Sequence, residues 1–302
     1  MRQYRYLHLD VFTDRPFEGN QLAVFPQAQG LEPAVMLQIA REMNFSESTF
    51  ILPPEHKGDV RMRIFTPGEE LPMAGHPTIG STFALAHEKV IEPGRPLFTF
   101  ELPVGPTPVE LEWDGDQLSF AWMTQQRPKY GAVATDARAL AEAVHVDAAE
   151  VMDVPLEEVS CGLPFFFLAL KSRKAVDQAE SDRLGIGRFF EKQKLPLRAV
   201  FLFTLAGGAD EATAYSRMFA PGLGIAEDPA TGAASGPLGC YLVKHGLVDP
   251  ERAAHFVSLQ GMKMQRPSRI HVSIDARGGE ITRVRVGGRA VLVGEGTLAI
   301  GN

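Results

Sequence analysis

Two polar residues stand at matched points of the chain, each at the start of an apolar stretch. His76 lies in Gly-His-Pro-Thr-Ile-Gly at residues 75–80, and Asp228 opens Asp-Pro-Ala-Thr-Gly-Ala at residues 228–233. The helical spacing that follows places both residues beside the free backbone N–H groups of a helix N-terminus. The helix dipole adds partial positive charge there, so each turn is suited to bind a carboxylate or a developing oxyanion.

Each turn follows a copy of one short motif. Arg-Ile-Phe-Thr-Pro-Gly at residues 63–68 recurs as Arg-Met-Phe-Ala-Pro-Gly at residues 217–222, one copy in each half of the 302-residue chain. The repeat predicts a duplicated fold whose two helix N-termini face one another across a central cleft. A structural alternative is that the small residues of the turns only let helix and sheet pack closely. These residues are Gly75, Gly80, Gly232 and Gly236.

Glu47 is the candidate acid/base. In an extended segment it lies on the same face as Phe45, Thr49 and Ile51. Desolvation among apolar and β-branched neighbours would raise its pKa toward the range in which one carboxyl group both removes and returns a proton. The alternative is a buried structural ion pair with an arginine such as Arg63.

His76 and Asp228 complete the catalytic candidates. His76 is predicted to hold or polarise a substrate oxygen, or to assist protonation, and Asp228 to hold a ring amine or hydroxyl. Asp228 also fits a purely structural role, because an Asp-Pro pair at a helix start is typical of an N-cap. We further predict substrate contacts from a set of small or polar residues near these positions: Asn20, Ser46, Gly75, Thr231, Gly232 and Ala233.

The elements that must position these residues belong to an α+β fold. Helices and strands alternate irregularly, which favours mixed sheets over a doubly wound sheet. The central helices, at residues 77 to about 89 and 232–243, have no substantial polar face before their last turn, so each is predicted to be buried in its own sheet. Other predicted strands are 6–12, 22–25, 45–52, 63–65, 162–170, 199–205, 270–274, 284–286 and 290–293. A hairpin is predicted around residues 113–116, and further helices at 33–43, ended by Asn44, and after Thr135 and Asp147.

Length and composition indicate a globular protein of two domains. The loss of periodicity over residues 124–131 predicts a linker that separates residues 1–125 from 126–302, and we expect residues after about 292 to pack back on the first domain. The net charge of −7 argues against nucleic acid or an anionic membrane as the main partner. No apolar span is long enough for a membrane helix and no secretory leader is evident, so the expected location is the cytoplasm.

No metal-ligand spacing and no phosphate-binding loop is present in the sequence, so neither a metal nor a cofactor is expected. The two cysteines give no disulfide framework. Cys161 is predicted to open a strand and Cys240 to lie more than two turns into the second central helix, and both are expected to be core residues.

Short motifs run in order over nearly the whole chain, at residues 19–24, 44–50, 63–80, 160–164, 227–232, 260–261 with 266–268, and 286–288. Together they resemble the phenazine-biosynthesis isomerase (PhzF-like) family. The resemblance implies the fold of diaminopimelate epimerase, with two pseudo-symmetric domains that are each a curved, barrel-like mixed sheet around a central helix. It also implies a homodimer with the site between the domains, and a cofactor-independent isomerisation of a small cyclic acid in which Glu47 moves a proton.

One departure from the family and two rival functions bear on that expectation. Better-known members have serine where this chain has Ala233, so a hydroxyl contact is lost while the backbone N–H remains. An amino-acid racemase or epimerase on the same scaffold is disfavoured, because neither cysteine occupies the matched turns where the two thiols of the epimerase relatives lie. The third function is a non-catalytic metabolite-binding or interaction protein that kept the fold.

Overall fold

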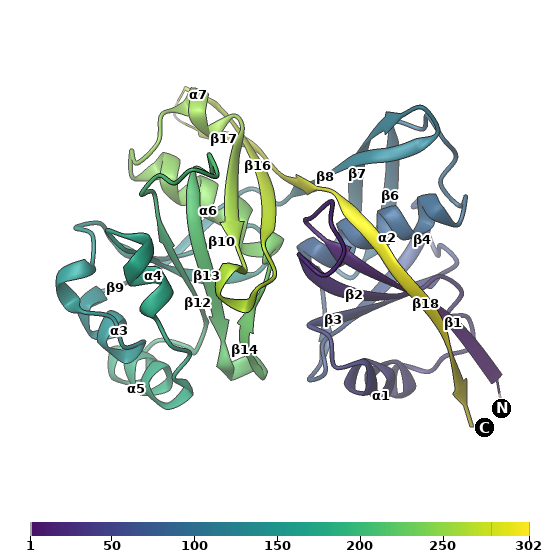
Figure 1. Ribbon diagram of the computed structural model, residues 1–302, viewed down its shortest axis with the longest axis horizontal. Helices are drawn as coiled ribbons and strands as arrows, with labels where there is room; N and C mark the ends of the chain where they lie inside the picture. Colours follow the sequence, from purple (N-terminus) through teal and green to yellow (C-terminus); the bar gives the residue numbers. More distant parts are fainter. Residues whose placement is uncertain (1, 279, 302) are drawn as a thin grey trace. The chain divides into compact units, whose positions relative to one another are not determined.

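The computed structural model describes residues 2–278 and 280–301. The chain divides into two compact units (Figure 1). Unit 1 holds residues 2–124 and 286–301, and unit 2 holds residues 125–278 and 280–285. Within the described residues, no helix has the length and apolar character needed to cross a lipid bilayer.

Unit 1 is a mixed sheet with two helices. Its helices are α1 (Pro33–Met43) and α2 (Gly75–His87), and its strands are β1 (Arg2–Val11), β2 (Asn20–Phe25), β3 (Glu47–Leu52), β4 (Val60–Phe65), β5 (Glu70–Leu71), β6 (Leu97–Leu102), β7 (Gly105–Asp114), β8 (Gln117–Gln125) and β18 (Ala290–Ile300). The strands neighbour one another in the order β18-β1-β2-β3-β4-β6-β7-β8, and β5 pairs with β4. The β2–β3 and β4–β6 pairs are parallel, so the sheet is mixed as predicted.

Helix α2 is the buried centre of unit 1. Strands β1, β2, β3 and β18 contact it, and nearly all of its residues as far as Leu85 are buried. Gly80 permits this close packing, because a Cβ there would lie 2.5 Å from Leu22 Cδ2 and 2.6 Å from Val11 Cγ2. The predicted apolar helix inside its own sheet is confirmed, and packing accounts for the glycine at position 80.

Helix α1 has the predicted bounds. Pro33 lies in its first turn, where a missing N–H costs nothing, and Asn44 ends it in the left-handed conformation with φ of 54°. Its apolar residues pack in a cluster that includes Phe25 and Phe50. Because α1 and α2 both contact β3, every residue of that strand is buried.

Unit 2 is built on the same plan with more helices. Its helices are α3 (Ala137–Ala143), α4 (Arg173–Gln178), α5 (Arg183–Gln193), α6 (Gly232–Lys244) and α7 (Pro250–Ala253), with 3₁₀ turns η1 (Ala148–Glu150), η2 (Pro221–Leu223) and η3 (Met262–Met264). Its strands are β9 (Lys129–Ala134), β10 (Leu156–Ser160), β11 (Pro164–Ala169), β12 (Ala199–Thr204), β13 (Ala214–Ala220), β14 (Ile225–Asp228), β15 (Phe256–Gln260), β16 (Ser268–Arg277) and β17 (Glu280–Gly288), whose last residues belong to unit 1.

The sheet of unit 2 is also mixed and also contains a buried helix. Neighbouring strands follow the order β9-β10-β11-β12-β13-β15-β16, with parallel pairs at β11–β12 and β13–β15. Helix α6 contacts β10, β11 and β16 and is buried from Gly232 to Leu242. A separate apolar cluster holds α3, α4 and α5 through residues such as Leu140, Val176 and Phe190. The second central helix is therefore confirmed as well.

Two predicted elements of unit 2 are wrong in part. Asp147 caps only the 3₁₀ turn η1, because the chain becomes extended again at Val151. The strand expected over residues 162–170 begins at Pro164, and Cys161 lies in the turn after β10 instead of opening a strand. That turn contains Gly162 at φ of 141°, a conformation that interrupts a strand.

The repeated motif forms the same ion pair in both units. Nε and Nη2 of Arg63 donate to the carboxylate of Glu70 at 2.7 and 2.6 Å. Nε and Nη2 of Arg217 donate to the carboxylate of Glu227 at 2.8 and 2.7 Å. In each case the guanidinium also lies over the phenylalanine two residues further along the chain. The duplication predicted from sequence thus extends to side-chain geometry.

Candidate active site

Glu47 lies at the first position of β3 and is 9% exposed. Its strand alternation directs it to the same side as Thr49, whose Oγ1 lies 2.9 Å from Oγ of Ser81 in α2. The carboxylate of Glu47 therefore faces α2. Arg63, the alternative partner, directs its guanidinium to Glu70.

Three side chains from three elements meet at the start of α2. Oε2 of Glu47 lies 3.4 Å from Nε2 of His76, and Nδ1 of His76 lies 3.1 Å from Nδ2 of Asn20. Asn20 opens β2, which runs parallel to β3 in a register that pairs Leu22 with Glu47. All three side chains are buried, with Asn20 1% and His76 3% exposed. The sheet register and the helix start together bring these three predicted site residues into contact.

His76 is neutral at physiological pH. Burial lowers the pKa of its imidazole from 6.5 to about 3, since the charged ring would lose its hydration, and a backbone hydrogen bond with Gln21 offsets this only in part. A neutral ring has one N–H donor and one acceptor nitrogen. His76 can therefore donate a hydrogen bond beside Glu47, but it does not supply a proton as an imidazolium near neutral pH.

The first turn of α2 adds backbone donors to this group. Ala74 precedes the helix in an extended conformation and forms no side-chain cap, and Gly75 and His76 are the first residues of the helix. The N–H groups of a first helical turn have no partner within the helix. Their partial positive charge favours negative charge next to Glu47, as expected from the sequence.

The start of α6 in unit 2 holds a different polar group. Thr231 Oγ1 donates to Oδ2 of Asp228 at 2.6 Å. Gln260 accepts from the backbone N–H of Thr231 at 3.0 Å, and its Nε2 donates to the backbone carbonyl of Asp228 at 2.7 Å and to Thr231 Oγ1 at 3.0 Å. Asp228, Thr231 and Gly232 are all buried. The hydrogen bonds of the Gln260 amide thus bring the predicted residues Asp228 and Thr231 together at the start of α6.

Gln260 is a site residue to which no role was predicted from sequence. The one sequence signal that could have pointed to Gln260 is the glycine that follows it. Gly261 has φ of 79°, and a Cβ there would lie 2.1 Å from the carbonyl oxygen of Arg266, so only glycine fits this position. A glycine required at that point fixes the end of β15 and hence the direction of the Gln260 side chain. The contact itself joins residues 29 positions apart, which no local pattern reveals.

Two predicted contact residues lie close to these groups in the chain. Ser46 is half-buried immediately before β3, and Ala233 is 7% exposed in the first turn of α6. Gly236, one turn further on, has a packing role, because a Cβ there would lie 2.0 Å from Oε1 of Gln125. Among the four glycines of the two turns, packing thus accounts for Gly80 and Gly236.

The two cysteines are buried and in contact with each other. Their Sγ atoms lie 3.8 Å apart, with Cys161 1% and Cys240 0% exposed. The neighbouring thiol and burial both raise the pKa of Cys240, so it remains a thiol. The prediction that they are core residues is confirmed, and neither lies in the first turn of α2 or α6.

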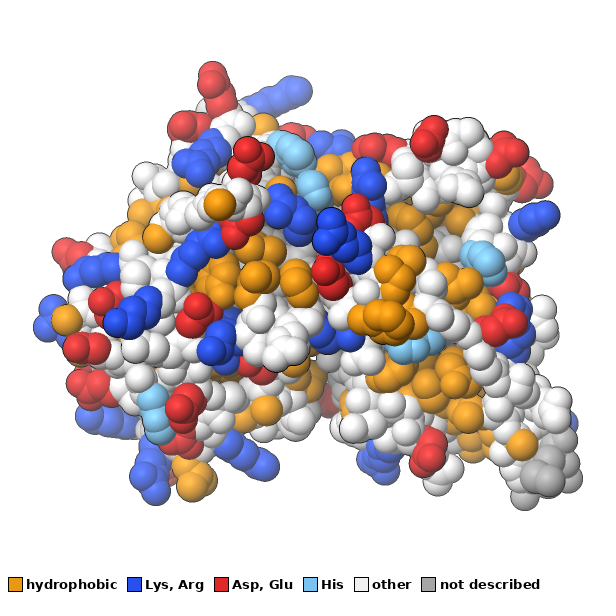
Figure 2. Space-filling model, viewed as in Figure 1, with side chains coloured by type: hydrophobic (Ala, Val, Ile, Leu, Met, Phe, Trp, Pro, Cys, Tyr) orange, Lys and Arg blue, Asp and Glu red, His pale blue; other side chains and the backbone are white. Residues whose placement is uncertain are grey.

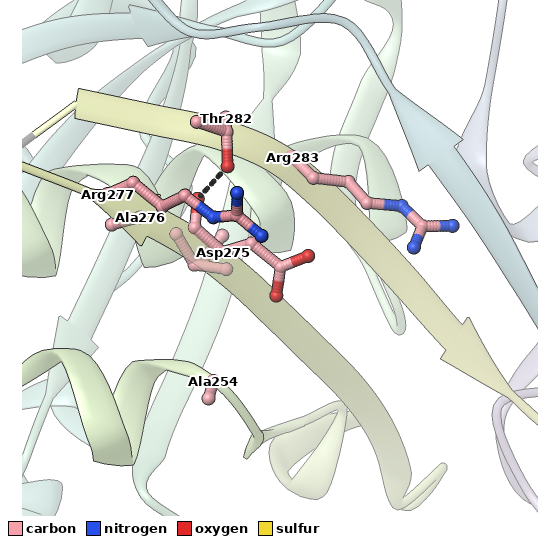
Figure 3. Close-up of a pocket in the computed structure, with 7 residues that line it drawn as sticks. Ala254, Asp275, Ala276, Arg277, Thr282 and Arg283 are labelled. Carbon is pink, nitrogen blue, oxygen red and sulfur yellow. Dashed lines mark hydrogen bonds between the residues drawn. The ribbon is translucent and has the colours of Figure 1, made fainter.

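A cavity of about 550 Å³ lies elsewhere in unit 2, on the β16–β17 hairpin (Figure 3). Thr282 Oγ1 donates to the backbone carbonyl of Asp275 at 3.1 Å, and the side chains of Arg277 and Arg283 extend from the two strands. None of the predicted site residues lines this cavity. Across residues 2–278 and 280–301, no group of three or more His, Cys, Asp or Glu side chains is arranged to hold a metal ion.

The face of the molecule in Figure 2 shows basic and acidic side chains interspersed among apolar ones. No large area of one charge is visible on that face.

Comparison with known proteins identifies the family. The model of the PhzC-PhzF family, described as phenazine biosynthesis-like protein, matches residues 9–296. The chain belongs to this family. A Pseudomonas fluorescens member named trans-2,3-dihydro-3-hydroxyanthranilate isomerase is 37% identical over 298 residues, which cover 98% of this chain and 100% of the relative. The expected enzyme class, an isomerase of the PhzF-like family, is confirmed.

Solved structures support the same assignment at the level of the fold. A PhzF-family phenazine biosynthesis protein from Bacillus anthracis superposes with a TM-score of 0.87 at 25% identity, over 99% of this chain and 100% of that one. A hydroxyproline epimerase from Agrobacterium vitis superposes with a TM-score of 0.66 at 14% identity, over 100% of this chain and 94% of that one, and shares the fold alone. The predicted α+β, epimerase-like fold of the PhzF family is therefore confirmed.

Proposed function

We propose that this PhzF-family enzyme is a cofactor-independent isomerase that moves a proton and a double bond in a small carboxylic acid, with Glu47 as the general acid/base. The contact of Glu47 with a buried, neutral His76 at the start of α2 is the observation that carries the proposal. A carboxylate next to a neutral donor and a helix N-terminus is equipped both to take a proton and to stabilise the charge that develops.

In the proposed reaction the ionised Glu47 removes a proton from a substrate carbon next to a conjugated system. The C–H electron pair enters that system, and negative charge develops on a substrate oxygen. The His76 N–H and the backbone N–H groups at the start of α2 stabilise that charge. Glu47, now a carboxylic acid, returns the proton to a different carbon, which shifts the double bond and restores the carboxylate.

The residues at the start of α6 are assigned to holding the substrate. Thr231 and Gln260 fix the position of Asp228, whose carboxylate suits a ring amine or hydroxyl. Gly232 and Ala233 contribute first-turn backbone to this group. The chemical class that fits is a small acid with a second polar substituent, as in the substrate named for the P. fluorescens relative.

The racemase alternative has less support. A two-thiol racemase on this scaffold needs an acid/base on each side of the reacting carbon, and the two thiols here are buried in mutual contact instead. A single acid/base that serves both proton transfers suits a double-bond shift better than an inversion of configuration.

The test is turnover of trans-2,3-dihydro-3-hydroxyanthranilate by the purified full chain, followed by absorbance and by NMR of the product in deuterium oxide. We expect isomerisation with deuterium at the newly protonated carbon, and no loss of rate after exhaustive treatment with EDTA. A requirement for added metal would refute the cofactor-free mechanism. Failure to turn over this acid and a panel of related cyclic amino acids, with binding retained, would favour a non-catalytic binding protein.

A further inference from the structure

The side-chain amide of Gln260 has a defined orientation, because two backbone groups determine which end is the oxygen. Its Oε1 accepts from the backbone N–H of Thr231 at 3.0 Å, and its Nε2 donates to the backbone carbonyl of Asp228 at 2.7 Å. A backbone N–H can only donate and a backbone carbonyl can only accept. The reversed amide would set donor against donor and acceptor against acceptor, so one orientation alone satisfies both groups.

This orientation fixes the direction of the Thr231 hydroxyl. The second hydrogen of Gln260 Nε2 is donated to Oγ1 of Thr231 at 3.0 Å, and an amide nitrogen does not accept in return. The single hydroxyl hydrogen of Thr231 is donated to Oδ2 of Asp228 at 2.6 Å. The hydrogen bonds therefore run in one direction, from the Gln260 amide through the Thr231 hydroxyl to the Asp228 carboxylate.

Thr231 does not play the usual local part of a residue in its position. It is the N-cap of α6, where a threonine hydroxyl typically accepts from an N–H of the first turn, but its side chain forms no such bond. Gln260, Thr231 and Asp228 are 0%, 8% and 5% exposed. Burial strengthens a chain of hydrogen bonds, because little water competes for its donors. The hydroxyl is thus directed to Asp228 and away from the helix.

We infer that Gln260 is a positioning and specificity-determining residue, which acts through Thr231 to hold Asp228 as an acceptor for a donor group of the substrate. The inference rests on the substrate-holding role proposed for Asp228 and adds what that role selects. A carboxylate that accepts from Thr231 presents acceptor oxygens only, so it favours a ring amine or hydroxyl over a carbonyl or a second carboxylate. It also has no proton to give, which leaves Glu47 as the acid/base of the proposed reaction.

The test is calorimetry of the full chain with anthranilate and benzoate, two carboxylate anions that differ by one ring amine. We expect the wild type to bind anthranilate about 10-fold more tightly than benzoate, the size of one hydrogen bond to a charged group. The ratio of the two affinities is the readout, because a variant that only loosens the fold weakens the binding of both ligands alike.

Gln260→Glu should make this ratio depend on pH. Burial and the neighbouring Asp228 both raise the pKa of the introduced carboxyl, so at about pH 6 it is protonated, still donates and keeps the preference for anthranilate. At about pH 8 the ionised form has no hydrogen to donate, and the preference should fall to about two-fold or less. A ratio equal to that of the wild type at the higher pH would overturn the inference, as would a wild type without any preference for anthranilate.

Gln193→Glu is the matched control, because Gln193 also accepts from the backbone N–H and the hydroxyl of a threonine, Thr135, but at an exposed position. It should leave the ratio unchanged at both pH values.

A second pair of variants tests the same chain of bonds if Gln260→Glu does not fold. Thr231→Val removes the hydroxyl and should lose the preference for anthranilate, whereas Thr231→Ser restores the hydroxyl and should keep it. Equal ratios in these two variants would overturn the inference. Because binding is measured without turnover, an absence of isomerisation with the preference intact would refute the proposed function alone.

Discussion

The starts of α2 and α6 occupy equivalent places in the two units but are built differently. At α2, Oε2 of Glu47 lies 3.4 Å from Nε2 of His76, and this ring nitrogen has no hydrogen-bond partner among the described residues. At α6, Thr231 and Gln260 form a closed set of hydrogen bonds around Asp228. This difference is the reason that we propose proton transfer for the group at α2 and the holding of substrate for the group at α6.

The ion pairs that precede the two helices also differ, because the pair in unit 2 is less exposed than the pair in unit 1. The side chains of Arg63 and Glu70 are 20% and 30% exposed, whereas those of Arg217 and Glu227 are 8% and 15% exposed. Nη1 of Arg217 also donates to the backbone carbonyls of residues 176, 177 and 179. The turn that carries Asp228 is therefore tied more firmly to its surroundings than the turn that carries His76.

The largest effect is expected from Glu47→Gln. This change keeps the shape of the side chain and removes its basicity, so kcat should fall by about 10²–10⁴, the usual contribution of a general base. Binding of anthranilate, an unreactive aromatic carboxylate, should change little, as measured by calorimetry. Near-normal kcat in this variant would contradict the assignment of the base.

The two arginines should differ in their effect on stability. Arg217→Met removes a buried guanidinium, and it leaves a half-buried carboxylate and several backbone carbonyls without their donor, at a cost of about 3 kcal/mol. Arg63→Met breaks a more exposed pair and should cost about 1 kcal/mol. Urea unfolding of the two variants measures the two losses of stability. Equal losses would mean that the two ion pairs contribute equally to the free energy of unfolding.

His76→Gln should weaken the dependence of the free energy of unfolding on pH below pH 6.5. Burial lowers the pKa of His76 in the folded chain from 6.5 to about 3, so between these values the unfolded chain binds a proton that the folded chain does not. The stability due to neutral His76 is present above pH 6.5 and is lost as pH falls toward 3. The slope reaches about 1.4 kcal/mol per pH unit.

Urea unfolding at a series of pH values, compared between wild type and His76→Gln, measures this slope. Gln260→Met is the control from unit 2, because the amide it removes does not titrate and its loss should lower stability by a similar amount at every pH. Parallel pH curves for wild type and His76→Gln would mean that the ring is not buried as a neutral group.

The smallest effect is expected from Ala233→Ser, which restores the hydroxyl found in better-known members of the family. One added hydrogen bond of about 1 kcal/mol should strengthen binding of anthranilate about five-fold and leave kcat unchanged. Calorimetry and initial rates measure the two quantities. Weaker binding would show that the hydroxyl does not reach the carboxylate from the first turn of α6.

Local signals predicted several elements well. Pro33 and Asn44 set both ends of α1, because proline suits a first turn and asparagine tolerates the left-handed conformation. The continuous apolar character of α2 and α6 predicted their burial. Helices α4 and α5 were missed. Helix α4 has only six residues, too few for a periodic pattern. Helix α5 did have a local signal, because Asp182 caps it by accepting from the N–H groups of Leu184 and Gly185.

Long-range contacts could not be predicted in this way. Asn20 and His76 are 56 residues apart, Thr231 and Gln260 are 29 apart, and the two cysteines are 79 apart. Sheet register and helix docking create these contacts, and neither follows from spacing along the chain. The alternation around Glu47 gave its direction, but not the imidazole that it faces or the neutrality of that ring.

The most direct test of the division between the units is deuterium incorporation at saturating substrate in deuterium oxide, compared between Glu47→Gln and Asp228→Asn. If unit 1 moves the proton and unit 2 holds the substrate, Asp228→Asn should have a higher KM but label product at a rate approaching wild type once saturated. Glu47→Gln should remain slow at every substrate concentration. Loss of labelling in Asp228→Asn that saturation does not restore, or rapid labelling by Glu47→Gln, would contradict the account.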